Sequence, residues 1–226
     1  MMTISATDDI VGKPMFCSWS GGKDSCLALY HAIQHGGSPK VLFTMLDEEA
    51  KRSRSHGLPV GFLRRQAEQL GLPVIFNSAA WSDYEARYQE TLKGFRAQGL
   101  VTGVFGDIDG EENRDWCVRM CATAGMGTYH PLWKRQRKDI LKEFIGLGFK
   151  STIVVTQADK LGSEWLGRQI DAQTIEDLEK TGIDVCGELG EYHTAVTGGP
   201  IFNSELVLET EEAILHDGHW FLRIAQ

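Results

Sequence analysis

Short apolar runs alternate with segments of helical periodicity over the first 156 residues of the chain. The apolar runs are continuous, as expected for strands that a parallel sheet buries on both faces. Regular alternation of strands and helices predicts a doubly wound α/β fold, in which right-handed crossovers connect the strands of a mostly parallel sheet. The predicted strands are 15–19, 41–46, 73–76, 101–105 and 151–156, and the predicted helices are 25–34, 61–70, 84–97 and 138–147.

The last third of the chain follows a different pattern. A helical stretch near 169–180 precedes three extended segments, 191–196, 204–209 and 219–224, which Gly-Gly-Pro and Asp-Gly turns separate. Short strands joined by tight turns predict a smaller α+β portion after the parallel sheet. We therefore divide the chain into a flexible leader (1–14), an α/β domain (15–156) and a C-terminal subdomain (157–226) that packs closely on that domain.

Charge and cysteine content limit the partners and the cellular compartment that are expected for this chain. The formal net charge is −8, and residues 111–226 carry 12 basic and 19 acidic side chains, which argues against nucleic acid as a partner. An odd number of cysteines, five, is typical of a reduced chain without a disulfide framework. The N-terminal residues lack a signal-peptide pattern, and no apolar run is long enough to span a membrane. We expect a cytoplasmic protein with no membrane partner, and we leave open whether it forms a homodimer.

A short polar segment, SWSGGKDS (18–25), joins the first predicted strand to the first predicted helix. A loop in that position binds phosphate when its backbone can approach the anion and its N–H groups point inward at the start of the helix. Gly21 and Gly22 permit the close approach, and the hydroxyls of Ser20 and Ser25 can donate hydrogen bonds. The segment therefore predicts a phosphate-binding loop.

Two charged residues refine this prediction. Lys23 adds a mobile positive charge for phosphate oxygens. Asp24 would repel phosphate on its own, but it fits a residue that caps backbone N–H groups or helps to hold Mg²⁺ beside the phosphates. The loop is not a Walker loop, because Asp24 stands where Ser or Thr would follow the lysine, and no G-x-G-x-x-G pattern occurs there. The alternative interpretation is a glycine turn that caps the helix.

The loop and four later motifs resemble a known family. SGGKDS (20–25) resembles the PP-loop of the N-type ATP pyrophosphatases, enzymes of HUP-like fold that cleave ATP between its α and β phosphates. Further along stand GDI (106–108), PLW (131–133), LGR (166–168) and DVCGELGEYHT (184–194). In this order the motifs resemble the diphthine–ammonia ligase family and its bacterial relatives, and the resemblance covers nearly the whole chain.

The resemblance implies a reaction. A loop that grips the β and γ phosphates of ATP stabilises pyrophosphate as the leaving group, so an acceptor oxygen attacks the α phosphorus. A carboxylate acceptor gives an acyl-adenylate, which ammonia converts to an amide with release of AMP. The chain is thus expected to be an ATP-dependent carboxylate–ammonia ligase that uses free ammonia, with 15–156 binding ATP and 157–226 on the substrate side.

The resemblance also assigns residues to the nucleotide. Asp24 and Asp107 are the expected Mg²⁺ ligands, and Asp107 has the alternative role of a helix cap. Arg168 is expected to contact a phosphate or a substrate carboxylate, with a surface ion pair to Asp171 or Glu164 as the alternative. The expected nucleotide contacts are Ser18, Ser20, Gly21, Gly22, Lys23, Asp24, Ser25, Gly106, Asp107 and Arg168.

A second polar stretch, 187–194, places two carboxylates, an imidazole and a hydroxyl between glycines. A solvated loop rarely combines these groups, so a functional site is expected here. Glu188 and Glu191 are expected to orient ammonia or the acceptor. His193 is expected to act as a base on the acceptor side, because the two glutamates would repel a triphosphate. The predicted catalytic residues are Lys23, Asp24, Glu188, Glu191 and His193.

The same stretch departs from the family that it resembles, whose pattern here is EGGEYET. His193 stands where that pattern has a glutamate, and Leu189 where it has a glycine. The histidine form resembles the bacterial branch, whose acceptor is not diphthine and is open to a role in cobamide metabolism. The ATP chemistry is therefore better supported than the acceptor.

Cys117 and Cys121 lie four residues apart on a predicted helix, within an apolar stripe. Further ligands at short spacing, which zinc requires, are not evident, so we expect both cysteines in the core. Two other classes of function compete with the ligase. A tRNA-thiolating enzyme would need a basic face and a C-x-x-C pair, which the sequence lacks, and an ATP- or AMP-binding regulatory module would release no pyrophosphate.

Overall fold

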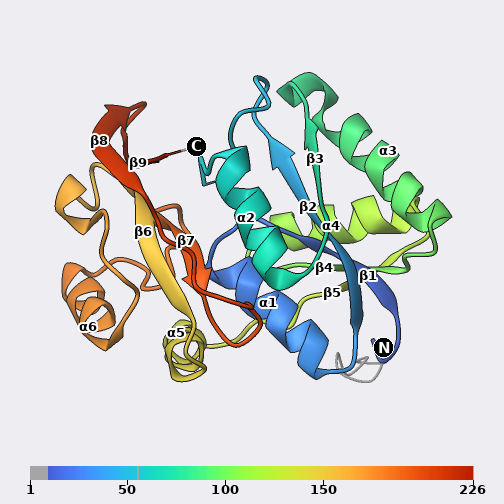
Figure 1. Ribbon diagram of the computed structural model, residues 1–226, viewed down its shortest axis with the longest axis horizontal. Helices are drawn as coiled ribbons and strands as arrows, with labels where there is room; N and C mark the ends of the chain where they lie inside the picture. The colour runs from blue at the N-terminus through green and yellow to red at the C-terminus, as the bar shows by residue number, and fades with distance from the viewer. Residues whose placement is uncertain (1–9, 55, 226) are drawn as a thin grey trace. The chain divides into compact units, whose positions relative to one another are not determined.

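The computed structural model describes residues 10–54 and 56–225 (Figure 1). No helix among these residues is long and apolar enough to cross a membrane. The chain divides into two compact units, which are described separately. The first unit comprises residues 1–19, 24–50 and 72–134, and the second comprises 20–23, 51–71 and 135–226.

The first unit is built on a five-stranded parallel sheet with strand order β3-β2-β1-β4-β5. This order confirms the predicted doubly wound α/β fold, because the chain adds strands first on one side of β1 and then on the other. The elements are β1 (Pro14–Ser18), α1 (Lys23–Gln34), β2 (Ser38–Leu46), β3 (Val74–Ser78), η1 (Trp81–Asp83), α3 (Tyr84–Ala97), β4 (Thr102–Val104), α4 (Glu111–Thr123) and β5 (Gly127–Tyr129).

The predicted flexible leader is packed where the structure describes it. Ile10 is buried, and the backbone N–H of Gly12 donates to the carbonyl of Gly36 at 2.8 Å. Because the apolar side chain of Ile10 is buried, residues before β1 contribute to the packing of the first unit. Residues 1–9 of the predicted leader lie outside the described residues.

Aromatic side chains fill the core of the first unit. The ring of Phe16, on β1, lies 6.3 Å from that of Phe43, 5.3 Å from that of Phe95 and 5.8 Å from that of Phe105, measured between centroids. All four side chains are buried. Such ring pairs stabilise a core beyond the apolar area that they bury, so β1, β2 and α3 are held together around Phe16.

Cys117 and Cys121 belong to this core, as the sequence predicts. Both are buried and free, at 6% and 0% exposure, and they pack beside Met120 on α4. The described residues contain no group of three or more His, Cys, Asp or Glu side chains that could hold a metal ion.

The second unit is built on a four-stranded antiparallel sheet with strand order β7-β6-β9-β8. The prediction that 151–156 joins the parallel sheet is wrong, because β6 pairs with β7 and β9. A central strand is covered on both faces in either kind of sheet, so a continuous apolar run does not separate the two. The elements are α2 (Val60–Leu70), α5 (Arg137–Gly146), β6 (Lys150–Gln157), η2 (Ser163–Trp165), α6 (Ala172–Thr181), β7 (Tyr192–Gly198), β8 (Thr210–His216) and β9 (His219–Ile224).

The unit boundary differs from the predicted one for the same reason. With β6 in the antiparallel sheet, the long second part of the chain begins at Arg135 rather than at residue 157. The second unit also takes in two earlier pieces, the loop 20–23 and the segment 51–71 that contains α2. These pieces are distant in sequence, so no local pattern assigned them.

The C-terminal hairpin corrects another prediction. Residues 204–209 do not form the predicted strand, and β8 lies directly after them. Asp217 and Gly218 both have positive φ, 46° and 73°, and their turn pairs His216 with His219. A two-residue turn of this kind fixes the strand before it as the partner of the strand after it. The three-residue β5 also escaped prediction, because so short a run shows no periodicity.

We predict that Cys117→Ala/Cys121→Ala lowers the free energy of unfolding by about 1–2 kcal/mol, because it removes two buried sulfur atoms from a packed core. The double variant should keep its ligand binding. Urea denaturation measures the stability, and metal analysis of the purified protein gives the control. Stoichiometric metal in the wild type that is lost in the variant would contradict the assignment to the core.

Candidate functional site

The first unit brings two predicted nucleotide-binding segments together at the carboxyl ends of its strands. β1 lies between β2 and β4, at the point where the strand order reverses and open α/β sheets bind ligands. A Cβ atom on Gly106, which follows β4, would lie 2.7 Å from the carbonyl carbon of Asp24 and 2.8 Å from the nitrogen of Ser25. Only glycine permits this contact with the first turn of α1. Ser18 is the last residue of β1 and stands at the same edge.

Asp107 has a partner that the sequence analysis did not single out. Its Oδ2 atom lies 3.2 Å from Nδ1 of His130, which directly follows β5. The His130 side chain is buried and stacks on Phe105, with 5.2 Å between ring centroids. The alternative role of Asp107 as a helix cap is not seen, because the N-cap of α4 is Gly110. The buried imidazole of His130 therefore lies beside the carboxylate that follows β4.

In the second unit, the loop Ser20–Lys23 is anchored along β7. The carbonyl of Gly21 accepts hydrogen bonds from the N–H of Val196 and from Nε2 of Gln66, both at 2.9 Å. Gln66 is fully buried, and its Nε2 also donates to the carbonyl of Val196 at 2.7 Å. Within the loop, the N–H of Gly22 donates to Oγ of Ser20 at 3.3 Å. One buried amide thus fixes the loop to the strand.

Both loop glycines are also required by packing. Gly21 has a φ of +81°, and a Cβ atom there would lie 2.6 Å from Cδ1 of Leu58. A Cβ atom on Gly22 would lie 2.3 Å from Cε1 of His56. Side chains at these positions would push the loop away from the segment 51–71. The sequence predicted close approach to a phosphate, and the structure adds close approach to this segment.

Lys23 connects the loop with the stretch 184–194. Its backbone N–H donates to Oγ1 of Thr194 at 3.1 Å, and its Nζ donates to the carbonyl of Cys186 at 2.5 Å. The Nζ atom also lies 5.4 Å from the centroid of the Tyr192 ring, a cation–π contact. The side chain is buried at 4% exposure. Two segments that the sequence predicts as sites, some 160 residues apart, therefore meet at one lysine.

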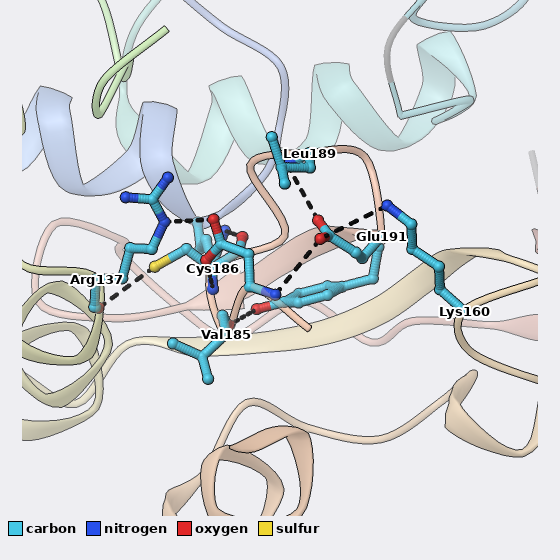
Figure 2. Close-up of polar contacts among 9 residues, drawn as sticks. Arg137, Lys160, Val185, Cys186, Leu189 and Glu191 are labelled. Carbon is cyan, nitrogen blue, oxygen red and sulfur yellow. Dashed lines mark hydrogen bonds and ion pairs between the residues drawn. The ribbon is translucent and has the colours of Figure 1, made fainter. Parts of the chain in front are cut away.

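The loop before β7 is braced by polar contacts (Figure 2). The buried Glu191 accepts a hydrogen bond from the N–H of Leu189 at 3.0 Å, and its other oxygen lies 3.8 Å from Nζ of Lys160. Arg137 donates to the carboxylate of Asp184. Glu191 thus holds the loop in shape. Glu188 is half-buried on the same loop.

His193 lies in a basic environment. Desolvation holds its pKa well below the usual range, and the neighbouring His56, Lys23 and His219 lower the pKa further. The His56 and His193 rings are 4.6 Å apart between centroids. His193 is therefore a neutral imidazole at pH 7. Its ionisable neighbours are basic, whereas the sequence had suggested a site shared with Glu188 and Glu191.

Arg168 contacts two residues that are close to it in sequence, Asp177 and Trp165. Its Nη2 donates to Oδ2 of Asp177 at 2.7 Å, and its guanidinium carbon lies 4.3 Å from the centroid of the Trp165 ring. The hydrogen bond from Arg168 is the main cause that lowers the pKa of Asp177 to about 2. Of the two ion-pair partners expected for Arg168, Asp171 instead caps α6, where it accepts from the N–H of Thr174 at 2.7 Å.

Three contributors were missed by sequence reasoning. Gln66 lies on an amphipathic helix where a polar side chain is expected to be exposed, and only its full burial reveals its role. His56 lies in an irregular loop with no motif around it. His130 directly precedes the PLW motif, and that position was the one available signal.

Two protein-family models match the chain. A family model described as the diphthamide synthase N-terminal domain matches residues 15–128, and one described as the diphthamide synthase C-terminal domain matches 136–226. The first unit defines a doubly wound α/β protein with a glycine loop between its first strand and first helix. The two matches show that the chain belongs to the diphthamide synthase family.

Curated relatives carry the name diphthine–ammonia ligase. The Mus musculus protein is 27% identical over 233 residues, which is 91% of this chain and 86% of the relative. The Homo sapiens protein is 25% identical, with the same coverage. The Schizosaccharomyces pombe protein is 24% identical over 87% of this chain and 36% of its own length.

Two solved structures are also similar. A 4-thiouridine synthetase–RNA complex with bound ATP is 14% identical with a TM-score of 0.42, and the match covers 82% of this chain and 56% of that one. A predicted subunit of tRNA methyltransferase from Methanocaldococcus jannaschii is 15% identical with a TM-score of 0.44, and the match covers 86% and 100%.

We predict that His193 makes the protein less stable in acid. Because its folded pKa is depressed, only the unfolded chain binds a proton as the pH falls below about 6.5, so stability falls by up to about 1.4 kcal/mol per pH unit. Above that pH the residue contributes no pH dependence. Urea midpoints between pH 7.5 and 5.5 should show a smaller acid loss for His193→Gln. The exposed His216 on β8 supplies the control, and equal losses in His193→Gln and His216→Gln would contradict this prediction.

Proposed function

We propose that this protein is an ATP-dependent ligase that adenylates a carboxylate acceptor and amidates it with ammonia, releasing AMP and pyrophosphate. The observation that carries the proposal is the contact of Gly106 with the first turn of α1, directly after the glycine loop. It puts Asp24, Ser25 and the residue before Asp107 side by side at the switch point of a parallel sheet. Membership of the diphthamide synthase family and the ligase names of the relatives support it.

In this proposal ATP places its β and γ phosphates on the loop 20–25. The hydroxyls of Ser20 and Ser25 and the N-terminus of α1 supply donors and a favourable dipole. Nζ of Lys23, which donates to the Cys186 carbonyl in the structure, transfers that hydrogen bond to a phosphate oxygen. The reach of a lysine stem permits this exchange without a backbone change.

Mg²⁺ fits the carboxylates at the ends of the first unit's strands. Protein sites for Mg²⁺ commonly use one or two carboxylates together with substrate phosphates and water. Asp24 lies in the first turn of α1, whose backbone Gly106 contacts, and Asp107 follows Gly106 directly. Nδ1 of His130 lies 3.2 Å from Oδ2 of Asp107. When bound, the ion would neutralise charge on the phosphates.

The chemistry then needs two displacements. The acceptor carboxylate forms a bond to the α phosphorus, and the electron pair of the α–β bridge leaves on pyrophosphate. Ammonia next attacks the acyl carbon, and AMP leaves with the electron pair of the acyl–oxygen bond. Glu191 already accepts a hydrogen bond within its own loop. We therefore assign Glu188, which is half-buried, as the base that accepts the proton that ammonia loses.

The relatives' name makes diphthine the first acceptor to test. The experiment incubates the protein with ATP, Mg²⁺, ammonium and an acceptor, and it follows AMP, pyrophosphate and the conversion of carboxylate to amide by mass spectrometry. Equal amounts of the three products support the ligase. ATP bound with no acceptor-dependent AMP would instead indicate a regulatory module. We also propose a cytoplasmic location, in keeping with five free, buried cysteines.

We predict that Lys23→Met and Asp24→Asn each lower the rate of AMP formation about 100-fold, since Lys23 stabilises the negative charge on the phosphates directly and Asp24 would hold the Mg²⁺ that does so. Asp115→Asn, on the exposed face of α4, is the matched control and should keep the wild-type rate. Circular dichroism confirms that each variant folds. Full activity in both loop variants would show that the nucleotide binds elsewhere.

A further inference from the structure

Four aromatic side chains meet where α3 contacts α4 in the first unit (Figure 1). Tyr84 and Tyr88 lie one turn apart on α3, and Trp81 precedes them in η1. Trp116, on α4, lies with its ring 5.8 Å from that of Tyr84 and 4.7 Å from that of Tyr88, measured between centroids. The rings of Trp81 and Tyr84 are 5.5 Å apart. Tyr84 therefore contacts both indoles, and these four residues are called the aromatic cluster below.

The aromatic cluster is open to solvent on one side. Trp81 is 71% exposed, and it is the only aromatic residue among the strongly exposed large apolar side chains in the described part of the chain. Tyr84 and Trp116 are half-buried, and Tyr88 is buried in the core of the unit. Contiguous aromatic surface that stays in water costs free energy without stabilising the fold, so it commonly marks a binding site.

Glu85 places a carboxylate beside the aromatic cluster. Its Oε1 accepts hydrogen bonds from Nε1 of Trp116 at 2.8 Å and from Nη2 of Arg119 at 2.7 Å. The first bond orients the indole, and Arg119 offsets part of the negative charge. Glu112 stands one turn before Trp116 on α4, is exposed and adds a carboxylate on the same side of the helix. A cation bound over these rings would therefore meet both negative ring faces and carboxylates.

The aromatic cluster adjoins the edge of the sheet where the candidate site lies. Cys117 follows Trp116 on α4, and its Sγ donates to Oδ2 of Asp107 at 4.0 Å. Burial and the neighbouring Cys117 raise the pKa of Tyr88, and Ser18, the last residue of β1, acts in the opposite direction. The Tyr88 phenol therefore lies beside the end of β1. A molecule held by the cluster is close to the carboxyl ends of β1 and β4, within the same unit.

A flat base and a compact cation are two groups that aromatic side chains commonly bind. A stacked base needs a ring face parallel to itself. The ring planes here are inclined to one another, by 65° for Tyr88 and Trp116, 40° for Tyr84 and Trp116, and 37° for Trp81 and Tyr84. Faces that point in different directions suit a rounded group, and the nearby carboxylates would repel the phosphates of a nucleotide. The observations therefore favour a cation.

We propose that Trp81, Tyr84 and Trp116, with Glu85 beside them, bind a quaternary ammonium group. Such a group carries charge but has no N–H to donate, so ring faces rather than polar side chains recognise it. The inference rests on the proposed function in one respect, because it assigns the ammonium group to the acceptor. The acceptor is then a zwitterion whose ammonium group lies on the cluster and whose carboxylate lies toward the ends of β1 and β4.

Choline chloride is the probe for this site. The matched ligand is its uncharged isostere, in which a tert-butyl group replaces the trimethylammonium group. The indole N–H signals of Trp81 and Trp116 in isotope-labelled protein report binding by nuclear magnetic resonance. We expect choline to shift both signals to saturation and to bind about tenfold more tightly than the isostere, because only choline carries the charge.

Variants at the exposed positions separate the rings from the carboxylate. Trp81→Ala should weaken choline binding about tenfold, and Trp81→Phe, which keeps a ring, should lose no more than about threefold. Glu85→Gln keeps an oxygen for Nε1 of Trp116 but removes the charge, so we expect about threefold weaker binding. Glu90→Gln is the matched control, because Glu90 is exposed on the same helix and pairs with Arg87. It should bind choline like the wild type, and circular dichroism checks that each variant folds.

Three outcomes overturn the inference. One is a wild type that binds no choline, or binds choline and the isostere equally. Another is unchanged choline affinity in folded Trp81→Ala and Glu85→Gln. The third is displacement of choline by AMP, which would assign the aromatic cluster to a nucleotide base.

AMP formation with an acceptor is measured separately. Choline should raise the KM for the acceptor and leave kcat unchanged, and an unchanged KM would contradict the assignment of the ammonium group to the acceptor. If choline binds as expected but no acceptor yields AMP, the cation site stands and the ligase assignment fails. If an acceptor yields AMP while the protein binds no choline, the ligase assignment stands and the inference fails.

Discussion

The double hydrogen bond at the Gly21 carbonyl is the interaction on which the site depends. A main-chain N–H from β7 and a buried amide from α2 converge on one oxygen. If this oxygen were left unsatisfied in a buried position, the loss would exceed that of an ordinary exposed hydrogen bond. The anchor fixes the loop so that Lys23 reaches Thr194 and Cys186, and so that Gly22 lies against His56.

This anchoring explains why a loop that the sequence assigns to one domain belongs by its contacts to another. Residues 20–23 sit between β1 and the body of α1, yet their contacts are with α2, β7 and the loop before β7. The residues on either side of the loop belong to the parallel-sheet unit. The loop therefore takes its conformation from β1 and α1, which flank it in sequence, and from α2, β7 and the loop before β7, which it contacts. Its glycines serve packing as well as ligand approach, and a substitution at Gly21 or Gly22 would disturb both.

The bounds of helices and strands were predicted best from the sequence where a local pattern marks them clearly. The helix at 84–97 was placed at the bounds that the structure shows, and the strand at 219–224 likewise, because periodicity or a tight turn marks each of them. The strand at 151–156 was predicted, but it was assigned to the wrong sheet. A continuous apolar run indicates that a strand is buried on both faces, but it does not identify the strands that pair with it. The extended segment at 204–209 was misread because alternation alone does not secure a pairing partner. The Asp217–Gly218 turn gives that partner to β8.

For the site, the sequence by itself determined the chemistry of the loop. Serines, glycines, a lysine and an aspartate between a strand and a helix predict phosphate binding from local backbone geometry alone. Only the tertiary structure decided what surrounds the loop. Gln66, His56, Thr194 and His193 lie about 35 to 170 positions from Gly22 and form no pattern with it. Their role arises from strand pairing and burial, which depend on contacts between distant segments. The same folding places His193 among basic groups, because neighbours in space, and not neighbours in sequence, set its charge state.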